Sequence, residues 1–276
     1  MSPLWRDEVG AYLSPHRICL VKMQRGVHPQ LAAQHEQRFE GVADEGWNRP
    51  LEALGALLAQ EPWRSSRIRI VLADHWARYA IAPWVAALGS NDERVAYGKQ
   101  LLASLYGDAV AGWDVRISDA PPGFTRIVCA ISGELIAAVR SLCLAHSCKL
   151  LSLQSQLVAS YAAWRHALPE ANAWFVSIEP GSMAAARVGT HGWDRVHVVR
   201  IGADWTRELK RLQTFGRLAS HAPQEGKVYV EAPQAWRESA LATVASPDAG
   251  GLQWLEDSGP ALTTLQHLSR TRRMAA

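Results

Sequence analysis

The sequence predicts an α/β protein with mixed sheets, and three observations carry that prediction. Segments rich in β-branched residues alternate with segments whose leucines recur at helical spacing. Some neighbouring strands are joined by tight turns, which require antiparallel pairing, whereas other strands are separated by a helix, as in parallel crossovers. The length of 276 residues suits one large domain or two closely packed lobes.

The first third of the chain is predicted to hold a hairpin, a helix and a long extended stretch. Residues 17–26 (RICLVKMQRG) alternate like a strand entering a turn, and 30–42 can pair back, although alanine and glutamine weaken that prediction. Residues 49–62 place four leucines on one face and end at a proline, which predicts a helix. Residues 67–74 (RIRIVLAD) are a strong strand, and 76–84 continue it in extended form.

The middle third is predicted to add a helix, a hairpin and a strand between two further helices. Residues 92–107 repeat apolar side chains at helical spacing and end at a glycine. Two strands, 113–120 and 125–132, flank a Pro-Pro-Gly turn and should therefore be antiparallel neighbours. A helix, a strand and a helix are then expected over 133–146, 149–155 and 155–168.

The last third opens on a hairpin. Residues 173–188 (AWFVSIEPGSMAAARV) are two apolar strands around a Glu-Pro-Gly-Ser turn, and 194–202 supply a third strand. Asp204 is a candidate N-cap for a helix over 204–219. A strand at 227–233 and helices at 234–245 and 261–273 complete the prediction.

Composition and charge exclude several classes of protein. The net charge is only +3 and the basic residues are spread along the chain, so we expect no nucleic-acid partner. No run of eighteen apolar residues occurs, and the start carries charged residues instead of an apolar core. We therefore expect a cytoplasmic protein that does not itself span a membrane.

Catalytic and metal motifs are absent from the sequence. The four cysteines lack zinc spacing, and the ten histidines include no His-Glu-x-x-His. Neither Gly-x-Ser-x-Gly nor Gly-x-Gly-x-x-Gly occurs. Asp74 and His75 are adjacent on an extended segment, so they should point to opposite faces, and Asp74 with Arg78 is expected to form a loop ion pair or a partner contact. We predict no metal site and no catalytic residue.

Three stretches of the sequence carry a resemblance to a known family: 67–85, 125–164 and the hairpin 173–188. Their order resembles the actin-like, ribonuclease-H-like fold, and most closely the PilM- and GspL-type cytoplasmic proteins of type IV pilus and type II secretion assembly. The resemblance covers residues 14–232. It implies a first lobe over 1–168, with a small α+β subdomain inserted at about 93–150, and a second lobe over 169–276.

Active members of the actin-like superfamily hold nucleotide with three elements, and each departs from the pattern here. In LVKMQRG, taken as the first hairpin, no carboxylate is present to hold magnesium. In VSIEPGSM, Glu179, Gly181 and Ser182 retain part of the phosphate turn, but Pro180 removes an N–H. In KVYVEAPQAW, Glu231 and its neighbours replace a Gly-Gly pair. We therefore expect no bound cofactor, ATP included.

The resemblance implies a non-catalytic scaffold of a bacterial type IV pilus or type II secretion-like assembly, peripheral at the cytoplasmic face of the inner membrane. Its partner would be the cytoplasmic tail of a single-pass inner-membrane protein, and contact with the motor ATPase is also implied. The partner groove would lie between the first lobe's sheet and the inserted subdomain, with Arg78, Trp84 and Tyr97 as candidate contacts.

Two other functions remain open at this point. One is an actin-like ATPase or small-molecule kinase, in which Gly181 and Ser182 would touch phosphate and Glu179 would act through a metal-bound water. The other is an unrelated role on a fold of the same class.

Overall fold

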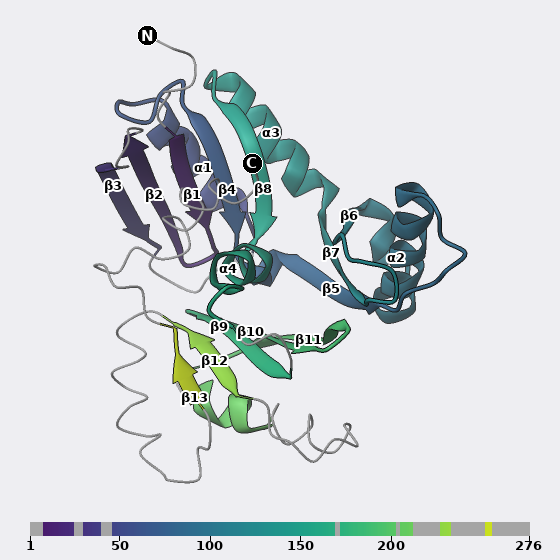
Figure 1. Ribbon diagram of the computed structural model, residues 1–276. Coiled ribbons are helices and arrows are strands. Elements are labelled where there is room, and N and C mark those ends of the chain that lie inside the picture. The colour runs from purple at the N-terminus through teal and green to yellow at the C-terminus, as the bar shows by residue number, and fades with distance from the viewer. Residues whose placement is uncertain are drawn as a thin grey trace.

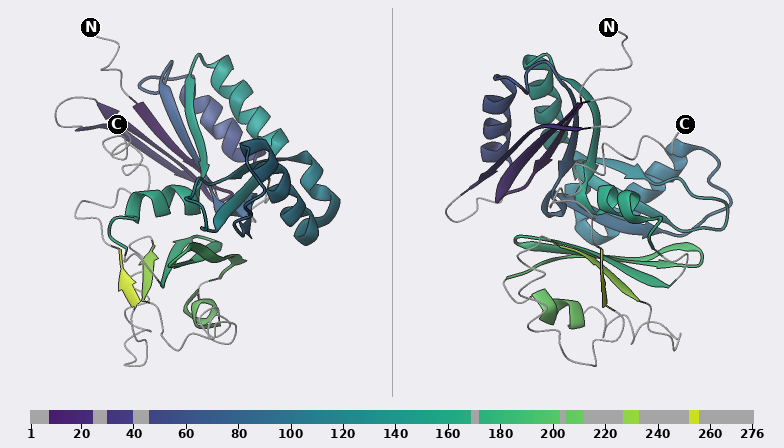
Figure 2. Two further views of the ribbon diagram at one scale, coloured as in Figure 1. Left: turned by 45° about the vertical axis from the view of Figure 1, so that its right-hand side comes forward. Right: turned by 60° about the vertical axis from the view of Figure 1, so that its left-hand side comes forward.

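Three β-sheets organise the protein in the computed structural model (Figure 1). The structure describes residues 8–24, 30–39, 46–168, 172–202, 205–211, 227–232 and 252–255. Within these ranges, two five-stranded sheets lie at opposite ends of the molecule and a three-stranded sheet lies beside them (Figures 1 and 2).

The first sheet has the strand order β3-β2-β1-β4-β8. The first three strands form an antiparallel meander, and β4 and β8 then add in parallel after crossovers. Helices α1 and α3 cover one face of the sheet (Figure 2), where Leu54, Leu58 and Leu135 are fully buried against strand side chains. The elements are β1 (Glu8–Leu13), β2 (Arg17–Gln24), β3 (Gln30–Arg38), α1 (Asn48–Leu58), β4 (Arg67–Leu72), α3 (Gly133–Ala145) and β8 (Lys149–Ser155).

The second sheet repeats the same plan, with the order β11-β10-β9-β12-β13. Its first three strands are again an antiparallel meander, and β12 and β13 add in parallel. Helical residues 205–211 pack on one face, where Trp205 meets Trp254 edge-to-face. The strands are β9 (Ala173–Glu179), β10 (Ser182–Gly189), β11 (Gly192–Arg200), β12 (Val228–Glu231) and β13 (Leu252–Trp254).

Helix α4 (Gln156–Trp164) joins the two lobes and lies between their sheets (Figure 1). Its Tyr161 packs on Phe175 of β9, with ring centroids 5.8 Å apart, and on Trp193 of β11 at 4.4 Å. Leu157 of the same helix is fully buried in the core that both sheets share. Aromatic pairs add to the free energy gained by burial, so these contacts of α4 stabilise the relative orientation of the two five-stranded sheets.

The three-stranded sheet, of order β5-β7-β6, is inserted between β4 and α3. Helix α2 covers one face, starting with a capping box in which Ser90 and Glu93 each bond the other's backbone N–H. The opposite face packs toward β11 of the second lobe. The elements are a short 3₁₀ turn (Asp74–Trp76), β5 (Ala77–Ala82), α2 (Asn91–Tyr106), a second 3₁₀ turn (Gly107–Gly112), β6 (Trp113–Ile117) and β7 (Arg126–Ser132).

The residues that form the three-stranded sheet differ from those of the small subdomain predicted at about 93–150. The three-stranded sheet begins earlier, with β5 at Ala77, because the extended stretch after β4 pairs with β7. It also ends earlier, since β8 pairs with β4 in the first sheet. The predicted division into lobes at 168/169 stays a prediction.

Most of the predicted helices and strands are present, and one strand of the structure, β1, was not predicted. Strand β1 lies at the centre of the first sheet, but Glu8 and Gly10 within a short apolar run hid it. The hairpin predicted at LVKMQRG is present, since the end of β2 pairs antiparallel with the start of β3, Met23 opposite Leu31. It is not the first hairpin, however, because β1 precedes β2 and pairs with it. The predicted Asp204 cap and the helices 234–245 and 261–273 lie outside the described residues.

No helix in the described ranges is long and apolar enough to cross a membrane. The longest of those in the element order, α2, has 16 residues and carries charges along its length.

Candidate functional site

Two hairpin turns meet at the junction of the lobes: the β1–β2 turn and the β9–β10 turn. His16 in the first turn lies against Gly181 in the second, since a Cβ built on Gly181 would fall 2.6 Å from His16 Nε2. Gly181 has a φ of 85°, a conformation that favours glycine. The imidazole thus occupies the space directly over the Gly181 backbone.

The backbone N–H groups of the first turn are already used. Ser14 Oγ accepts hydrogen bonds from the N–H of His16 at 3.3 Å and of Arg17 at 3.0 Å. The same hydroxyl donates to Arg17 O at 3.1 Å, and Pro15 has no N–H to offer. A phosphate would need free N–H groups here, and Ser14 takes them instead.

The second turn brings Glu179, Gly181 and Ser182 together, as the sequence indicated. Glu179 and Ser182 are each only 5% exposed, and the carbonyl of Gly181 accepts from Ile201 N at 3.1 Å. Pro180 contributes no donor. The turn is therefore a buried hairpin turn with few accessible hydrogen-bond donors.

Three carboxyl groups from distant parts of the chain influence one another at this junction. Asp74 follows β4, Glu179 ends β9 and Glu231 ends β12, where it lies beside Ser177. Burial, helped by the charges of Asp74 and Glu231, raises the pKa of Glu179 to about 8, against the lowering effects of the Tyr12 hydroxyl and Arg17. Burial likewise raises the pKa of Asp74 to about 7.

These pKa shifts bear on metal chemistry. A protonated carboxyl offers magnesium a poor ligand, and the raised pKa of Glu179 favours its protonated form. Within the described ranges, no three His, Cys, Asp or Glu side chains are grouped closely enough to hold a metal ion. Lys22, the cation of the hairpin predicted from sequence, donates to Pro62 O at 2.8 Å and lies away from this junction.

Asp74 has a structural task. Its Oδ1 accepts from the Tyr79 hydroxyl and, at 3.0 Å, from Leu157 N at the start of α4. The predicted ion pair with Arg78 is wrong, because Arg78 Nη1 donates to the carbonyls of His75 and Ala77, both at 2.9 Å. The buried carboxyl joins β4, the insert and α4.

A groove with a volume of about 520 Å³ lies along β8, the edge strand of the first sheet. Consecutive β8 residues from Leu150 to Ser155 line it, so both faces and the strand edge border the space. Arg140 and Ile136 of α3 form one wall, and β6 and β7 of the insert form the other. The groove thus lies between the first sheet and the insert, and partner binding there stays a prediction.

The three partner contacts predicted from sequence do not line this groove. Arg78 lies on β5, Trp84 is 42% exposed after that strand, and Tyr97 is half-buried against the insert's core. Sequence reasoning missed Ser14 and His16, although a Ser-Pro pair between two apolar runs is a turn signal that could have located their hairpin.

Comparisons with known proteins place this geometry in a wider group. No protein-family model and no curated protein matches the chain. Solved structures do match. One is a Bacteroides thetaiotaomicron protein with an actin-like ATPase fold and unknown function, at a TM-score of 0.64 and 10% identity, covering 95% of both chains.

Two further solved structures belong to secretion and pilus systems. The PilM-PilN type IV pilus biogenesis complex matches at a TM-score of 0.66 and 14% identity, over 96% of this chain and 98% of that one. The cytoplasmic domain of EpsL, an inner-membrane component of the Vibrio cholerae type II secretion system, matches at 0.59 and 10%, over 98% and 96%. The chain therefore has the actin-like fold, and the predicted resemblance to this group is confirmed.

Proposed function

We propose that this protein is a non-catalytic cytoplasmic scaffold of a type IV pilus or type II secretion-like assembly. It binds the cytoplasmic tail of a single-pass inner-membrane protein at the inner-membrane face and relays contact to the motor ATPase. The proposal extends to this chain what the PilM-PilN and EpsL structures are named for.

The groove along β8 is the observation that carries the proposal. An edge strand presents unpaired backbone groups, and a neighbouring extended peptide can add to it as a further strand. In this groove, half-buried Leu151 and Leu153 offer apolar contact, and Arg140 is exposed at the rim. A short extended tail with apolar residues and an acidic group complements these features.

The covered hairpin junction supports the absence of catalysis. His16 lies over Gly181, Ser14 takes the N–H groups of the first turn, and Pro180 has none. Each lost charge-assisted hydrogen bond to phosphate costs on the order of 1.5–3 kcal/mol of binding free energy. Several such losses together leave little affinity for a nucleotide.

Capture of the partner tests the scaffold role. The wild-type protein, immobilised and exposed to detergent extracts of the source cell's membranes, should retain a single-pass pilus or secretion protein. Leu151→Asp and Arg140→Glu should each reduce that capture, because they alter the apolar wall and the charge of the groove. Leu144→Asp is the matched control, since Leu144 is 81% exposed on the same helix and does not line the groove.

Two outcomes would oppose the proposal. One is recovery of soluble metabolic enzymes alone, and the other is equal capture by all three variants. Folding of each variant is checked by its thermal unfolding curve, because only folded protein reports on the groove.

Calorimetric titration with Mg-ATP tests the non-catalytic part separately. Weak or no binding is expected from the covered junction. The alternative, an actin-like ATPase or small-molecule kinase, assigns phosphate contacts to Gly181 and Ser182 and a metal-bound water to Glu179. Micromolar binding that Glu179→Ala abolishes would establish that alternative.

A further inference from the structure

Two loops leave the same end of the three-stranded sheet. Ala82, the last residue of β5, pairs with Arg126, the first residue of β7, so the loop after β5 and the loop before β7 start side by side. Strand β6 ends beside them, since Ile117 pairs with Val128. Residues 83–89 of the first loop and 120–124 of the second are here called the insert loops.

The insert loops are apolar and exposed. Residues 83–89 read PWVAALG and residues 120–124 read APPGF, so neither loop carries a charged side chain. Trp84 is 42% exposed. The other exposed residues are Pro83, Ala86, Ala87 and Gly89 in the first loop and Pro121, Pro122 and Gly123 in the second. Exposed apolar groups gathered at one end of a globular domain mark an interaction site.

The backbone of the second insert loop offers few free donors. Pro121 and Pro122 have no N–H. Phe124 N donates to Pro121 O at 3.2 Å, and the ring of Phe124 meets His191 edge-on with the ring centroids 5.7 Å apart. The next residue, Thr125, donates its N–H to His191 O at 2.8 Å. A segment that enters an apolar medium needs its backbone groups satisfied in this way.

Arginines at the bases of the loops bond loop carbonyls. Arg94 Nη1 donates to Gly89 O at 3.4 Å, and Arg126 Nη2 donates to Ala120 O at 2.8 Å. In the first loop, a tight turn is closed by a bond from Leu88 N to the carbonyl of residue 85 at 3.2 Å. Both loops are thus held in a defined conformation by their own hydrogen bonds.

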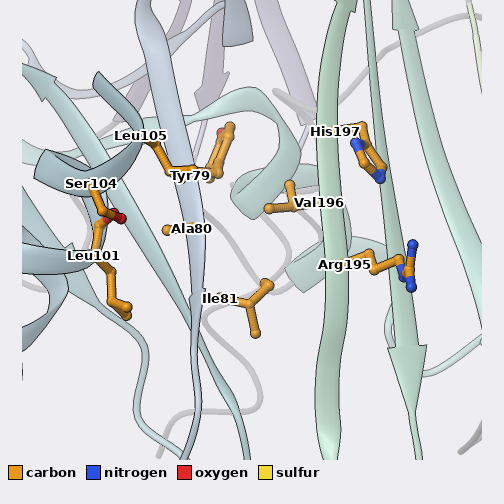
Figure 3. Close-up of a pocket in the computed structure, with 9 residues that line it drawn as sticks. All are labelled: Tyr79, Ala80, Ile81, Leu101, Ser104, Leu105, Arg195, Val196 and His197. Carbon is orange, nitrogen blue, oxygen red and sulfur yellow. The ribbon is translucent and has the colours of Figure 1, made fainter. Parts of the chain in front are cut away.

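The insert that carries these loops is fixed to the second lobe along one side. Tyr79 and Ile81 extend from β5 toward β11, and Val196 extends back toward β5, across a hollow of about 330 Å³ (Figure 3). Nearer the loops, the Thr125 hydroxyl donates to Trp193 O at 2.6 Å. The insert loops are therefore a preformed surface, which binds without the free-energy cost of ordering itself.

These features suit a lipid surface better than a protein partner. Protein interfaces carry about one hydrogen bond per 100–200 Å², whereas the indole N–H of Trp84 is the only polar side-chain group in the two loops. Tryptophan is enriched where membrane meets water, because its ring is apolar and its N–H is polar. Charges of both signs lie near the loop bases, with Arg94 and Arg126 against Glu93 and Asp119. Attraction to anionic headgroups is therefore not the main contribution.

We propose that the insert loops enter the interface of a lipid membrane, with Trp84, Pro121 and Pro122 placed among the lipid headgroups. The contact is driven by burial of apolar groups, and it attaches the protein to the membrane directly, in addition to any bound partner tail. The inference rests on the proposed function only for the membrane concerned, the inner one. It does not depend on the β8 groove.

Flotation of the full chain with phosphatidylcholine vesicles tests the proposal. The wild type should float with the vesicles, and the bound fraction should fall about threefold or more in Trp84→Asp, because a charge is costly in an apolar medium. Added salt should change wild-type binding little, since the loops carry no charge. Leu144→Asp places the same charge at a residue that is 81% exposed on α3, and this matched control should float like the wild type.

A second measurement reports insertion itself. Ala87→Cys, labelled with the environment-sensitive fluorophore NBD, should shift its emission to the blue when vesicles are added and should be quenched by spin-labelled lipid in them. The wild type, treated identically, gives the background from the four native cysteines. Thermal unfolding curves check that each variant is folded.

The proposal is wrong if the wild type does not float, if Trp84→Asp floats equally well, or if the label stays in water. Flotation that added salt abolishes would point to surface charge and would also overturn it. A Trp84→Asp variant that floats normally but no longer captures the membrane partner would assign the loops to a protein. Because the vesicles hold no protein, failure here leaves the capture test of the β8 groove unaffected.

Discussion

The imidazole of His16 packs against the backbone of Gly181, so one lobe's hairpin covers the turn of the other. A side chain of any size on Gly181 would overlap the ring, because even a Cβ would lie 2.6 Å from Nε2. The contact joins two turns that are 165 positions apart in the chain, and it removes the space between them that a ligand would otherwise enter.

Gly181→Ala should lower the free energy of unfolding by more than the strain of the positive φ alone would. A left-handed backbone costs a non-glycine residue about 1–2 kcal/mol, and the methyl group must also displace His16. Gly123→Ala is the matched control, since Gly123 has a φ of 83° and open space around its Cβ position. Urea denaturation of both variants measures the difference.

The excess loss in Gly181→Ala should disappear in a His16→Ala background. That double-mutant cycle isolates the contact between the two turns from the backbone strain. An unchanged excess would mean that His16 does not determine the cost.

Stability should fall as pH rises from about 5 to 8. The folded pKa of Glu179, about 8, exceeds its unfolded value of about 4.3, so the folded state binds more protons between these values. Stability is therefore fully present below the unfolded pKa and is lost as pH rises through the folded pKa. Denaturation midpoints at pH 5.5 and 8.0 should differ less in Glu179→Gln than in the wild type.

Glu93→Gln supplies the control for that pH dependence. Glu93 is exposed, and hydrogen bonds with Ser90 lower its pKa, so it does not titrate between pH 5.5 and 8. This variant should keep the wild-type pH dependence. An equal flattening in both variants would contradict the role given to the buried carboxyl.

The fold was predictable from sequence to the extent that local patterns determine it. The hairpin 173–188 and the crossovers around 133–168 were legible because turn residues separate apolar runs of the right lengths. Strand β1 was not predicted from the sequence. A central strand that is buried on both faces needs no alternation of apolar and polar residues, and Glu8 and Gly10 also interrupt its apolar run. Because that strand was missed, the β2–β3 hairpin was taken for the first hairpin, which is formed by β1 and β2.

The site was predictable only where its residues are close in sequence. Glu179, Gly181 and Ser182 share one turn, so their proximity follows from the hairpin. Asp74 and Glu231 reach the same junction from other strands, and tertiary packing alone brings them there. Sequence proximity likewise could not show which residues line the β8 groove, and the predicted contacts Arg78, Trp84 and Tyr97 do not line it.

Removing the Asp74 carboxyl should be more costly than neutralising it. Asp74→Ala leaves the Tyr79 hydroxyl and Leu157 N without their buried acceptor, at about 2–4 kcal/mol in the free energy of unfolding. Asp74→Asn keeps an acceptor oxygen and should cost less than half as much. Similar losses in the two variants, measured by urea denaturation, would contradict the acceptor role.

Gly192→Ala should loosen the insert from the second lobe. Its φ is 100°, and a Cβ would lie 2.6 Å from the backbone oxygen of Thr125, which cannot rotate away as a side chain can. We expect faster amide hydrogen exchange at Thr125, because its N–H bonds to His191 O across this contact. Gly123→Ala, with similar strain and no neighbour, should leave that exchange rate unchanged.

The common strand order of the two sheets has a consequence for how this architecture can diversify. Each lobe is a complete meander followed by two crossovers, so the molecule is close to a duplicated unit with an approximate internal symmetry. Among the described residues, only the first unit's crossover from β4 carries a three-stranded insertion. Insertion there leaves every hydrogen-bonded ladder of the five-stranded sheets intact, so this module and the β8 groove beside it can change in sequence while both sheets keep their pairing.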